Sequence, residues 1–195
     1  MPGDQVLPDP LGGLSPGERT AVAGGTGLVP YLDRALTRSG RAPAPRWVIS
    51  PEPVQASLLR DYFTDVASRY YGRPATVAEV DAALAEDPSD DLVCFLVGRY
   101  DGVPSGCVGL RLIGPGIAEL TRMFVHPRTR RTRGGHALLA AAGDAALGLG
   151  AHAMRLDTRD DLVEARSLYA GHGYAPIPAY SHGPYADHWF EKHLD

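Results

Sequence analysis

The sequence lacks any long apolar run. No stretch of about 18 apolar residues, the length that a membrane-spanning helix needs, occurs in its 195 residues. The first ten residues, MPGDQVLPDP, have neither the basic nor the apolar region of a secretory signal. We therefore expect a protein that has no membrane partner and works in the cytoplasm.

Cysteine is scarce as well. Cys94 and Cys107 are the only two, and both stand within apolar, strand-like runs. Two such residues are more typical of buried free thiols in a reducing compartment than of a disulfide framework or a metal site. His182 and His188 are not spaced like a zinc-binding set, so we expect no metal.

Neither sign of charge dominates. The 19 basic and 23 acidic residues leave a net charge of -4, which argues against a protein that binds nucleic acid with its whole surface. Hydrophobic residues make up 44% and charged residues 22% of the chain, as in soluble globular proteins of one compact domain. Residues 1–45 are rich in Gly and Pro and predict an arm, and residues 46–195 predict the domain.

The domain begins with a pattern of one strand and two helices. Residues 47–49 predict a short strand, after which Ser50 is placed to cap a helix whose first turn tolerates Pro51. The core-facing stripe of this helix consists of Leu59, Tyr62, Phe63, Val66 and Tyr70. A capping box of Thr76 and Glu79 starts the second helix.

The rest of the domain alternates strands and helices. Apolar runs predict strands at 92–97, 107–113, 117–125, 154–158 and 187–194. One helix runs from about Gly134 to Gly150, and a later one is capped by Asp161 and Glu164. This order predicts a mixed α/β sheet that is at least partly antiparallel, rather than a doubly wound sheet.

The most informative segment runs from Glu119 to Leu139. A strand leads into a loop with four arginines, which continues through Gly134 and Gly135 into the amino terminus of a helix. Unpaired backbone N–H groups, the positive end of the helix and guanidinium groups would meet there, so the segment predicts a site for a diphosphate or polyphosphate. A solvated arginine run is the alternative for the loop taken alone.

This loop resembles the acyl-CoA-binding motif of the GCN5-related N-acetyltransferases, the GNAT superfamily. The motif reads Gln/Arg-x-x-Gly-x-Gly/Ala and lies between the fourth strand and the third helix of that fold. Arg130 matches its first position and Gly135 its last, whereas Arg133 stands where the family has its central Gly. Residues 168–174 are similar to the family's LY-x-x-x-GF segment, and residues 178–192 resemble a bacterial, small-molecule-type subgroup.

The resemblance covers about residues 47–194 and implies a fold and a co-substrate. The GNAT fold is an α/β fold with a mixed, mostly antiparallel central sheet, about four flanking helices, and parallel strands that splay apart at the acyl-CoA site. The co-substrate is acetyl-CoA. In the family the strand before the loop carries a bulge, and its unpaired amides take the pantetheine arm, which would place Met123, Phe124 and Val125 there.

The resemblance also assigns the pyrophosphate of CoA to the loop. The residues that would hold it are Arg130, Arg131, Thr132, Arg133, Gly134, Gly135 and His136. Arg133 adds a Cβ where the family brings backbone close to the pyrophosphate. The neighbouring glycines would let the loop adapt while Arg133 adds charge, and weaker cofactor binding is the alternative.

Acetyl transfer to an amine needs two proton-handling groups. An ammonium with a pKa of about 10.4 must lose a proton before it attacks, and the departing thiolate must be neutralised. By resemblance, Tyr169 is the acid that protonates the sulfur of CoA, and a core tyrosine is its alternative role. Glu119 aligns with the glutamate that serves as the base in the histone acetyltransferase branch.

Glu119 has alternatives of its own. Strand alternation places it on one face with Thr121, Met123 and Val125, opposite Leu120 and Phe124. From there it could draw a proton directly or through water. It could instead pair with Arg122 or Arg111, or bind the ammonium of the substrate.

Residues 180–188 mix aromatic and polar side chains, which suits a pocket for a small amine. The candidates are Tyr180, Tyr185 and His188, and a solvated loop is the alternative. We expect an acetyl-CoA-dependent N-acetyltransferase that acts on a primary amine of a small molecule by direct attack in a ternary complex. The alternatives are a protein or peptide amine, which needs an open groove beside the thioester, and a non-catalytic acyl-CoA sensor. A homodimer is a candidate assembly.

Overall fold

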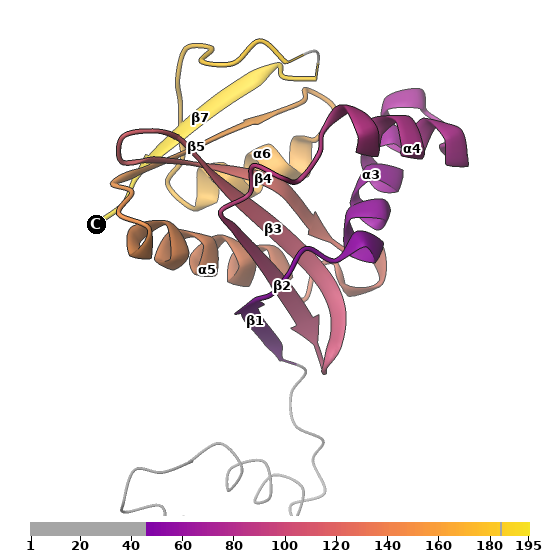
Figure 1. The fold of residues 1–195 in the computed structure, drawn as a ribbon, viewed down its shortest axis with the longest axis horizontal. Coiled ribbons are helices and arrows are strands. Elements are labelled where there is room, and N and C mark those ends of the chain that lie inside the picture. Colours follow the sequence, from indigo (N-terminus) through magenta and orange to yellow (C-terminus); the bar gives the residue numbers. More distant parts are fainter. Residues whose placement is uncertain (1–45, 184) are drawn as a thin grey trace, which may run out of the picture. The chain divides into compact units, whose positions relative to one another are not determined.

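Residues 46–183 and 185–195 are described by a computed structural model of the protein. Within them, seven strands form one sheet in the order β1-β2-β3-β4-β5-β7-β6 (Figure 1). The strands are β1 Trp47–Pro51, β2 Cys94–Tyr100, β3 Val103–Gly114, β4 Ile117–Val125, β5 Ala153–Thr158, β6 Ala175–Pro176 and β7 His188–His193. Neighbours are antiparallel except β4 and β5, which are parallel, so the predicted mixed, mostly antiparallel sheet is confirmed.

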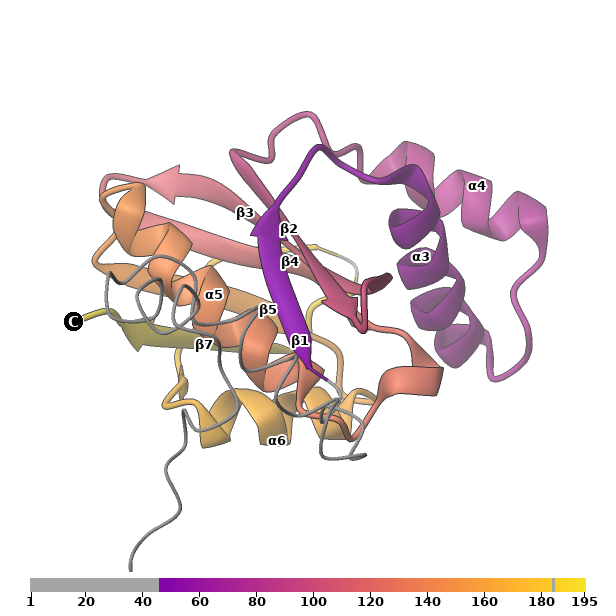
Figure 2. The same ribbon diagram turned by 90° about the horizontal axis from the view of Figure 1, so that it is seen from below.

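Four α-helices flank the sheet in the described part of the chain. They are α3 Ala56–Tyr71, α4 Val77–Glu86, α5 Gly134–Gly148 and α6 Val163–Gly171. Figures 1 and 2 show α3 and α4 side by side, apart from α5 and α6. The capping box that starts α4 is present, because Thr76 accepts from the backbone of Glu79 and Glu79 accepts from the backbone of Thr76.

Two predicted helix starts are wrong. Ser50 and Pro51 belong to β1, and α3 begins only after Gln55. Proline disfavours the helical conformation of the residue before it, so Pro51 and Pro53 keep this segment extended.

The second wrong start is that of α6. Leu162 is its N-cap, with no side-chain capping bond. Asp161 instead accepts two hydrogen bonds from Arg159, at 2.8 and 2.7 Å, and Glu164 pairs with Arg69 of α3. The two carboxylates that were expected to cap the helix therefore fix arginines beside it.

Two hydrophobic clusters hold the sheet to its helices. The larger one joins α5 and Tyr169 of α6 to the strands through Leu110, Leu138 and Leu156. The smaller one joins α3 to β2, β3 and β4 through Leu58, Leu59, Phe95, Val97, Cys107 and Phe124. Cys94 and Cys107 are free thiols, as predicted, and burial raises the pKa of Cys107 to about 12, so it stays protonated.

A bulge in β4 reverses which side chains face which cluster. Cys107 pairs with Phe124 and Gly109 with Thr121, so β4 has one extra residue between these pairs, and Arg122 there has a φ of 51°. As a result Leu120 packs in the cluster beside α5, and Phe124 packs in the cluster beside α3. The prediction that these two share a face is wrong beyond Thr121, because simple alternation does not include the bulge.

Two further predictions concern the N-terminal arm and a membrane partner. The predicted arm, residues 1–45, lies outside the described residues. Within the described ranges no helix has the length and apolarity to cross a bilayer.

Candidate active site

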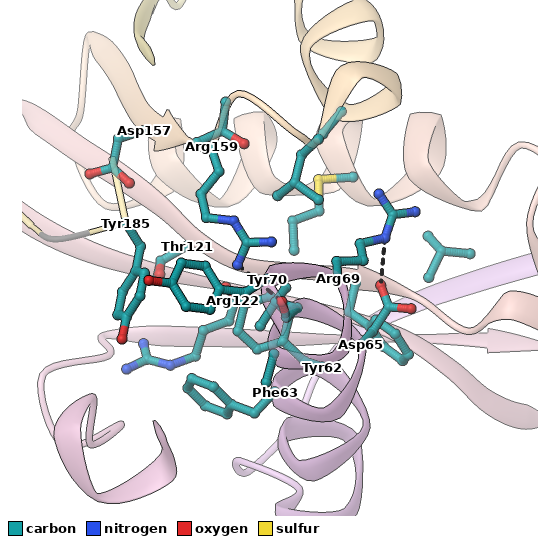
Figure 3. Close-up of a pocket in the computed structure, with 18 of the residues that line it drawn as sticks. Tyr62, Phe63, Asp65, Arg69, Tyr70, Thr121, Arg122, Asp157, Arg159 and Tyr185 are labelled. Carbon is teal, nitrogen blue, oxygen red and sulfur yellow. Dashed lines mark hydrogen bonds and ion pairs between the residues drawn. The ribbon is translucent and has the colours of Figure 1, made fainter. Parts of the chain in front are cut away.

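The parallel strands β4 and β5 separate soon after they begin to pair. Ile117, Ala118 and Glu119 pair with residues 153–155, and the register of the pair ends there. A cavity of about 1270 Å³ opens where the strands diverge, and α3, α4, α6 and the loop before α5 complete its walls. In Figure 3, Asp157 of β5 and Tyr70 of α3 border this space.

One wall of the cavity is the end of β4. Met123, Phe124 and Val125 all line it, beyond the last residues that pair with β5. The bulge and the separation of the strands, both implied by the family resemblance, are therefore present. The edge of β4 here lies against open space rather than against a neighbouring strand.

The arginine loop forms the next part of the wall. Arg130, Arg131 and Arg133 line the cavity together with Gly134, Gly135 and His136. Arg130 is held in place, because it donates to the carbonyl of Val125 at 3.1 Å and to Asp65 at 2.8 Å. Thr132 points elsewhere: its hydroxyl donates to the carbonyl of Thr129 and accepts from the indole of Trp47 at 2.9 Å.

The glycines of the loop are required by close packing. A Cβ on Gly134 would lie 2.2 Å from the Trp47 ring, and a Cβ on Gly135 would lie 2.8 Å from Leu168. Arg133 is the N-cap of α5 and has a φ of 70°, a left-handed conformation that favours glycine. The first N–H groups of α5, which have no acceptor one turn earlier, stand directly after it.

His136 closes this end of the cavity. Its Nδ1 lies 2.7 Å from Nε2 of His172, just beyond the end of α6. Burial and the neighbouring His136 lower the pKa of His172, so the pair bridges the two helices with at least one neutral ring.

Tyr169 of α6 lines the cavity. It is 6% exposed and packs against the rings of Tyr174 and Phe190. Burial raises the pKa of its hydroxyl well above the usual range, so the phenol is protonated at neutral pH. A neutral phenol is a hydrogen-bond donor that can also give up a proton.

Glu119 is the last residue of β4 that pairs with β5. It is 5% exposed, lines the cavity, and accepts a hydrogen bond from Tyr180 at 2.7 Å and an ion-pair bond from Arg111. Of the two arginines considered for it from the sequence, it pairs with Arg111; Arg122 pairs with Asp87 instead, at 2.7 Å.

A second carboxylate was not predicted. Asp157, near the end of β5, lines the cavity, and accepts a hydrogen bond from Ser181 at 2.9 Å. Burial raises the pKa of Asp157, and the charge of Glu119 raises it further. The sequence does contain a signal for it, because Asp157 stands within the predicted strand 154–158. An ionisable side chain in a buried strand is often a functional residue.

Comparisons with known proteins can now be set beside this geometry. A family model described as the acetyltransferase (GNAT) family matches residues 56–174. An uncharacterized N-acetyltransferase of Schizosaccharomyces pombe is 32% identical over 134 residues, which are 65% of this chain and 78% of that protein. The chain belongs to the GNAT acetyltransferase family.

Solved structures of GNAT proteins share the fold. An acetyltransferase of this family from Staphylococcus aureus aligns with a TM-score of 0.61 and 16% identity, over 76% of this chain and 100% of the other. A PaiA N-acetyltransferase from Thermoplasma acidophilum, solved in complex with coenzyme A, aligns with a TM-score of 0.57 and 19% identity, over 75% and 99%. At these identities the likeness shows the fold alone.

The three candidate acceptor residues of this GNAT protein occupy different places. Tyr185 lines the cavity, 47% exposed, and its ring meets that of Tyr70 edge to face. Tyr180 lies in a neighbouring recess of about 450 Å³ that shares Glu119 with the cavity. His188 does not line the cavity; its Nε2 lies 3.0 Å from Asp160 and 3.2 Å from Arg166 of α6.

Helix α3 of this GNAT protein supplies a wall that the sequence assigned to the core. Leu59 and Phe63 are buried as expected, but Tyr70 is 57% exposed, and Tyr62 and Val66 line the cavity. The apolar stripe of α3 therefore faces the cavity as well as the hydrophobic core. Among the described residues no group of three His, Cys, Asp or Glu side chains is placed to hold a metal ion.

Proposed function

We propose that the protein is an acetyl-CoA-dependent N-acetyltransferase that transfers the acetyl group to a primary amine of a small molecule. The observation that carries the proposal is one cavity that joins the arginine loop, Tyr169, the buried carboxylate of Glu119 and the half-buried carboxylate of Asp157. A place for a diphosphate, an acid and a base are the three parts that acetyl transfer to an amine requires.

The residues present fit coenzyme A. Arg131 and Arg133 bring positive charge beside the N-terminus of α5, and Gly134 and Gly135 let Trp47 and Leu168 pack against the first turn of that helix. The free edge of β4 at Met123 to Val125 would take the pantetheine arm as an added strand. The co-substrate supplies an activated acetyl thioester at the open end of that edge.

The proposed mechanism uses Asp157 and Tyr169 for proton transfer. The substrate ammonium gives a proton to Asp157, directly or through one water, and the free amine then attacks the thioester carbonyl carbon. As the carbon–sulfur bond breaks, Tyr169 gives its phenolic proton to the departing sulfur, and the tyrosinate regains a proton, through water, from the nitrogen that has become the amide. Asp157 then returns its proton to solvent. Burial raises the pKa of both groups, which makes Asp157 a stronger base and keeps Tyr169 protonated.

Glu119 takes a supporting part in this proposal. Both of its oxygens already accept hydrogen bonds, one from Tyr180 and one from Arg111. Its charge raises the pKa of Asp157 and attracts a cationic amine into the cavity. We therefore assign to Asp157 the role of general base, which the family resemblance gave to Glu119.

The chain around Tyr180 and Ser181, which we call the tail, favours a small acceptor over a protein. Tyr180 and Ser181 bond to the two carboxylates and Trp189 donates to Ser181 at 2.8 Å, so this segment is fixed across the carboxylates. Tyr185 also stands at the cavity, edge to face with Tyr70. A protein lysine would need an open groove beside the thioester, and a segment fixed at the two carboxylates favours a smaller acceptor.

The proposal is tested by thiol release from acetyl-CoA over a panel of small primary amines and a lysine peptide. With one amine of the panel, rates measured at several concentrations of both substrates should give intersecting double-reciprocal lines, because direct attack needs both substrates bound. Parallel lines would contradict direct attack. Binding of acetyl-CoA without thiol release for any acceptor would indicate a sensor and overturn the proposal.

A further inference from the structure

Three tyrosines with exposed rings stand together at the cavity, and we call them the tyrosine wall. Tyr70 and Tyr71 lie at the end of α3, and Tyr185 comes from the chain before β7. All three line the cavity, and they are 57%, 45% and 47% exposed. Large rings that border a cavity and stay open to solvent, rather than packing in the core, are typical of a surface that meets a ligand.

Contacts among the rings hold the tyrosine wall in place. The ring of Tyr70 meets the rings of Tyr71 and Tyr185 edge to face, with 5.2 and 5.4 Å between the ring centroids. The guanidinium of Arg159 lies 5.5 Å from the centroid of Tyr70, and two hydrogen bonds to Asp161 fix this arginine. A surface that is ordered before its ligand arrives loses little conformational entropy on binding.

The tyrosine wall lies near the carboxylate to which we assign the role of base. Asp157 precedes Arg159 by two residues, which span about 7 Å of extended chain, and Arg159 contacts Tyr70. Ser181, close to Tyr185 in the chain, donates to Asp157 at 2.9 Å. Figure 3 shows Asp157, Tyr70 and Tyr185 around one space. An amine whose nitrogen lies at Asp157 therefore has the rest of its body beside the rings.

The charges near the tyrosine wall favour an acceptor whose far end is neutral. The guanidinium carbons of Arg159 and Arg73 lie 5.5 and 4.9 Å from the ring centroids of Tyr70 and Tyr71. Cations of the protein thus already cover a face of each ring that a second ammonium could take. Glu86 also lines the cavity, but it is exposed, so water screens its charge. The tyrosine wall offers ring surface rather than a site for a second positive charge.

We propose that the acceptor is a primary amine whose nitrogen is joined by a short carbon chain to an aromatic ring, and that the tyrosine wall binds this ring. The inference rests on the proposed function and names the acceptor class of the same site. The ring packs against Tyr70 and Tyr185 while the ammonium lies at Asp157. Aromatic pairs gain more than their buried area alone provides, because the positive edge of one ring attracts the negative face of another.

The test uses amines that differ in the aromaticity or charge of the far end. Thiol release from acetyl-CoA is measured with phenethylamine, cyclohexylethylamine, hexylamine and hexamethylenediamine. The wild-type protein should have a KM about 2- to 10-fold lower for phenethylamine than for cyclohexylethylamine, although the two share a carbon skeleton and the saturated ring is the more hydrophobic. Hexamethylenediamine should have no lower a KM than hexylamine, because the tyrosine wall has no place for its second charge.

Variants of the tyrosine wall locate the ring. Tyr70→Leu and Tyr185→Leu remove a ring and keep an apolar side chain, so each should reduce the preference for phenethylamine over cyclohexylethylamine, and the double variant should abolish it. The KM for acetyl-CoA should stay unchanged, and Tyr70→Phe should keep the preference. Val77→Ala, which shortens an exposed side chain of α4 outside the cavity, is the control. Both tyrosines are about half exposed, and leucine is a strong helix former, so the variants should fold.

A binding measurement keeps the inference separate from the proposed function. Thermal unfolding is followed in the presence of CoA with each amine. Stronger stabilisation by phenethylamine than by cyclohexylethylamine, lost in the double variant, supports the inference even if no turnover is found, and only the proposed function then fails. Thiol release with equal KM values for the two amines would keep the proposed function and overturn the inference.

Three further results would overturn the inference. A lower KM for cyclohexylethylamine than for phenethylamine in the wild type would show that only apolar area is bound. A lower KM for hexamethylenediamine than for phenethylamine would show that the far end of the acceptor is a second cation. A preference for phenethylamine that survives in the double variant would place the ring away from Tyr70 and Tyr185.

Discussion

At the scale of single residues, the account depends on groups whose environment changes their chemistry. Tyr169 and Asp157 face one cavity, and burial raises the pKa of each, which favours a protonated phenol and a more basic carboxylate. Both effects come from the surrounding fold, because neither side chain is unusual in the sequence itself.

Tyr169→Phe should lower kcat by about 10²- to 10⁴-fold, the usual contribution of one general acid, and leave the KM for acetyl-CoA nearly unchanged. Thiol-release kinetics measure both values. Tyr174→Phe is the matched control: its ring packs on Tyr169, but its hydroxyl is buried with no hydrogen-bond partner in residues 46–183 and 185–195, and it does not line the cavity. The control should keep full activity, and equal losses in both variants would remove the acid role of Tyr169.

Asp157→Asn should change the pH dependence of stability in a defined direction. Burial raises the native pKa of Asp157 above its ordinary 3.8, so the folded state holds this proton more tightly than the unfolded chain. Stability from this proton is complete below the unfolded value and is lost as the pH rises through the raised native value. Asn cannot ionise, so the variant should gain stability over the wild type at pH 7 relative to pH 4.

Urea unfolding at both pH values measures this difference. Asp144→Asn, at an exposed position on α5, is the control for the substitution itself, because that carboxylate is not buried. An Asp157→Asn variant that loses stability more at pH 7 than at pH 4 would contradict the raised pKa. The same variant should lose the acidic limb of the kcat/KM profile if Asp157 is the base.

At the scale of elements, the loop before α5 shows why the motif needs glycine at some positions and tolerates arginine at another. The glycines at 134 and 135 allow Trp47 and Leu168 to approach, whereas the residue at 133 needs only a left-handed backbone. Arg133 adopts that conformation at a cost and adds charge at the N-terminus of α5.

Gly134→Ala should destabilise the protein by about 1–3 kcal/mol, because the new Cβ would overlap the ring of Trp47. It should also weaken CoA binding, since the loop must move. Gly143→Ala, in the same helix with its nearest neighbour at 3.9 Å, should stabilise by about 0.5–1 kcal/mol. Urea unfolding measures both, and a stable Gly134→Ala variant would refute the close approach.

Arg133→Gly should stabilise the fold by about 1 kcal/mol, because glycine adopts the left-handed conformation without strain. Arg128→Gly, in the same loop but with a negative φ, should destabilise instead, since glycine there only adds entropy to the unfolded chain. Thermal unfolding of the two variants gives opposite shifts if the backbone argument is right. Shifts of the same sign would contradict it.

Regular elements could be predicted from sequence, and features that depend on distant contacts could not. The limits of β4 and the start of α5 follow from apolar runs and glycines, and the structure confirms them. The bulge at Arg122 was implied only by family resemblance, and its effect on the later side chains of β4 was missed. The role of α3 was missed because a cavity wall and a core face have the same apolar period.

At the scale of the whole domain, the site exists because two strands that start together separate. The divergence of β4 and β5 opens the cavity, α5 and α6 bring the loop and Tyr169 to one side, and the tail brings Tyr180 and Ser181 to the carboxylates. Segments far apart in the sequence thus supply the proposed acid, the proposed base and the proposed anion site. This arrangement supports one chemistry, acetyl transfer from a diphosphate-bearing carrier to an amine.

The most direct test of that claim is a mass balance of the reaction. Protein, acetyl-CoA and an amine acceptor found in the screen are incubated together, and free thiol and acetylated amine are quantified from the same sample. The account predicts one acetylated amine for each thiol released, with both products reduced together in Tyr169→Phe. Thiol released at the same rate without the amine, or thiol without acetylated amine, would show hydrolysis rather than transfer and would contradict the account.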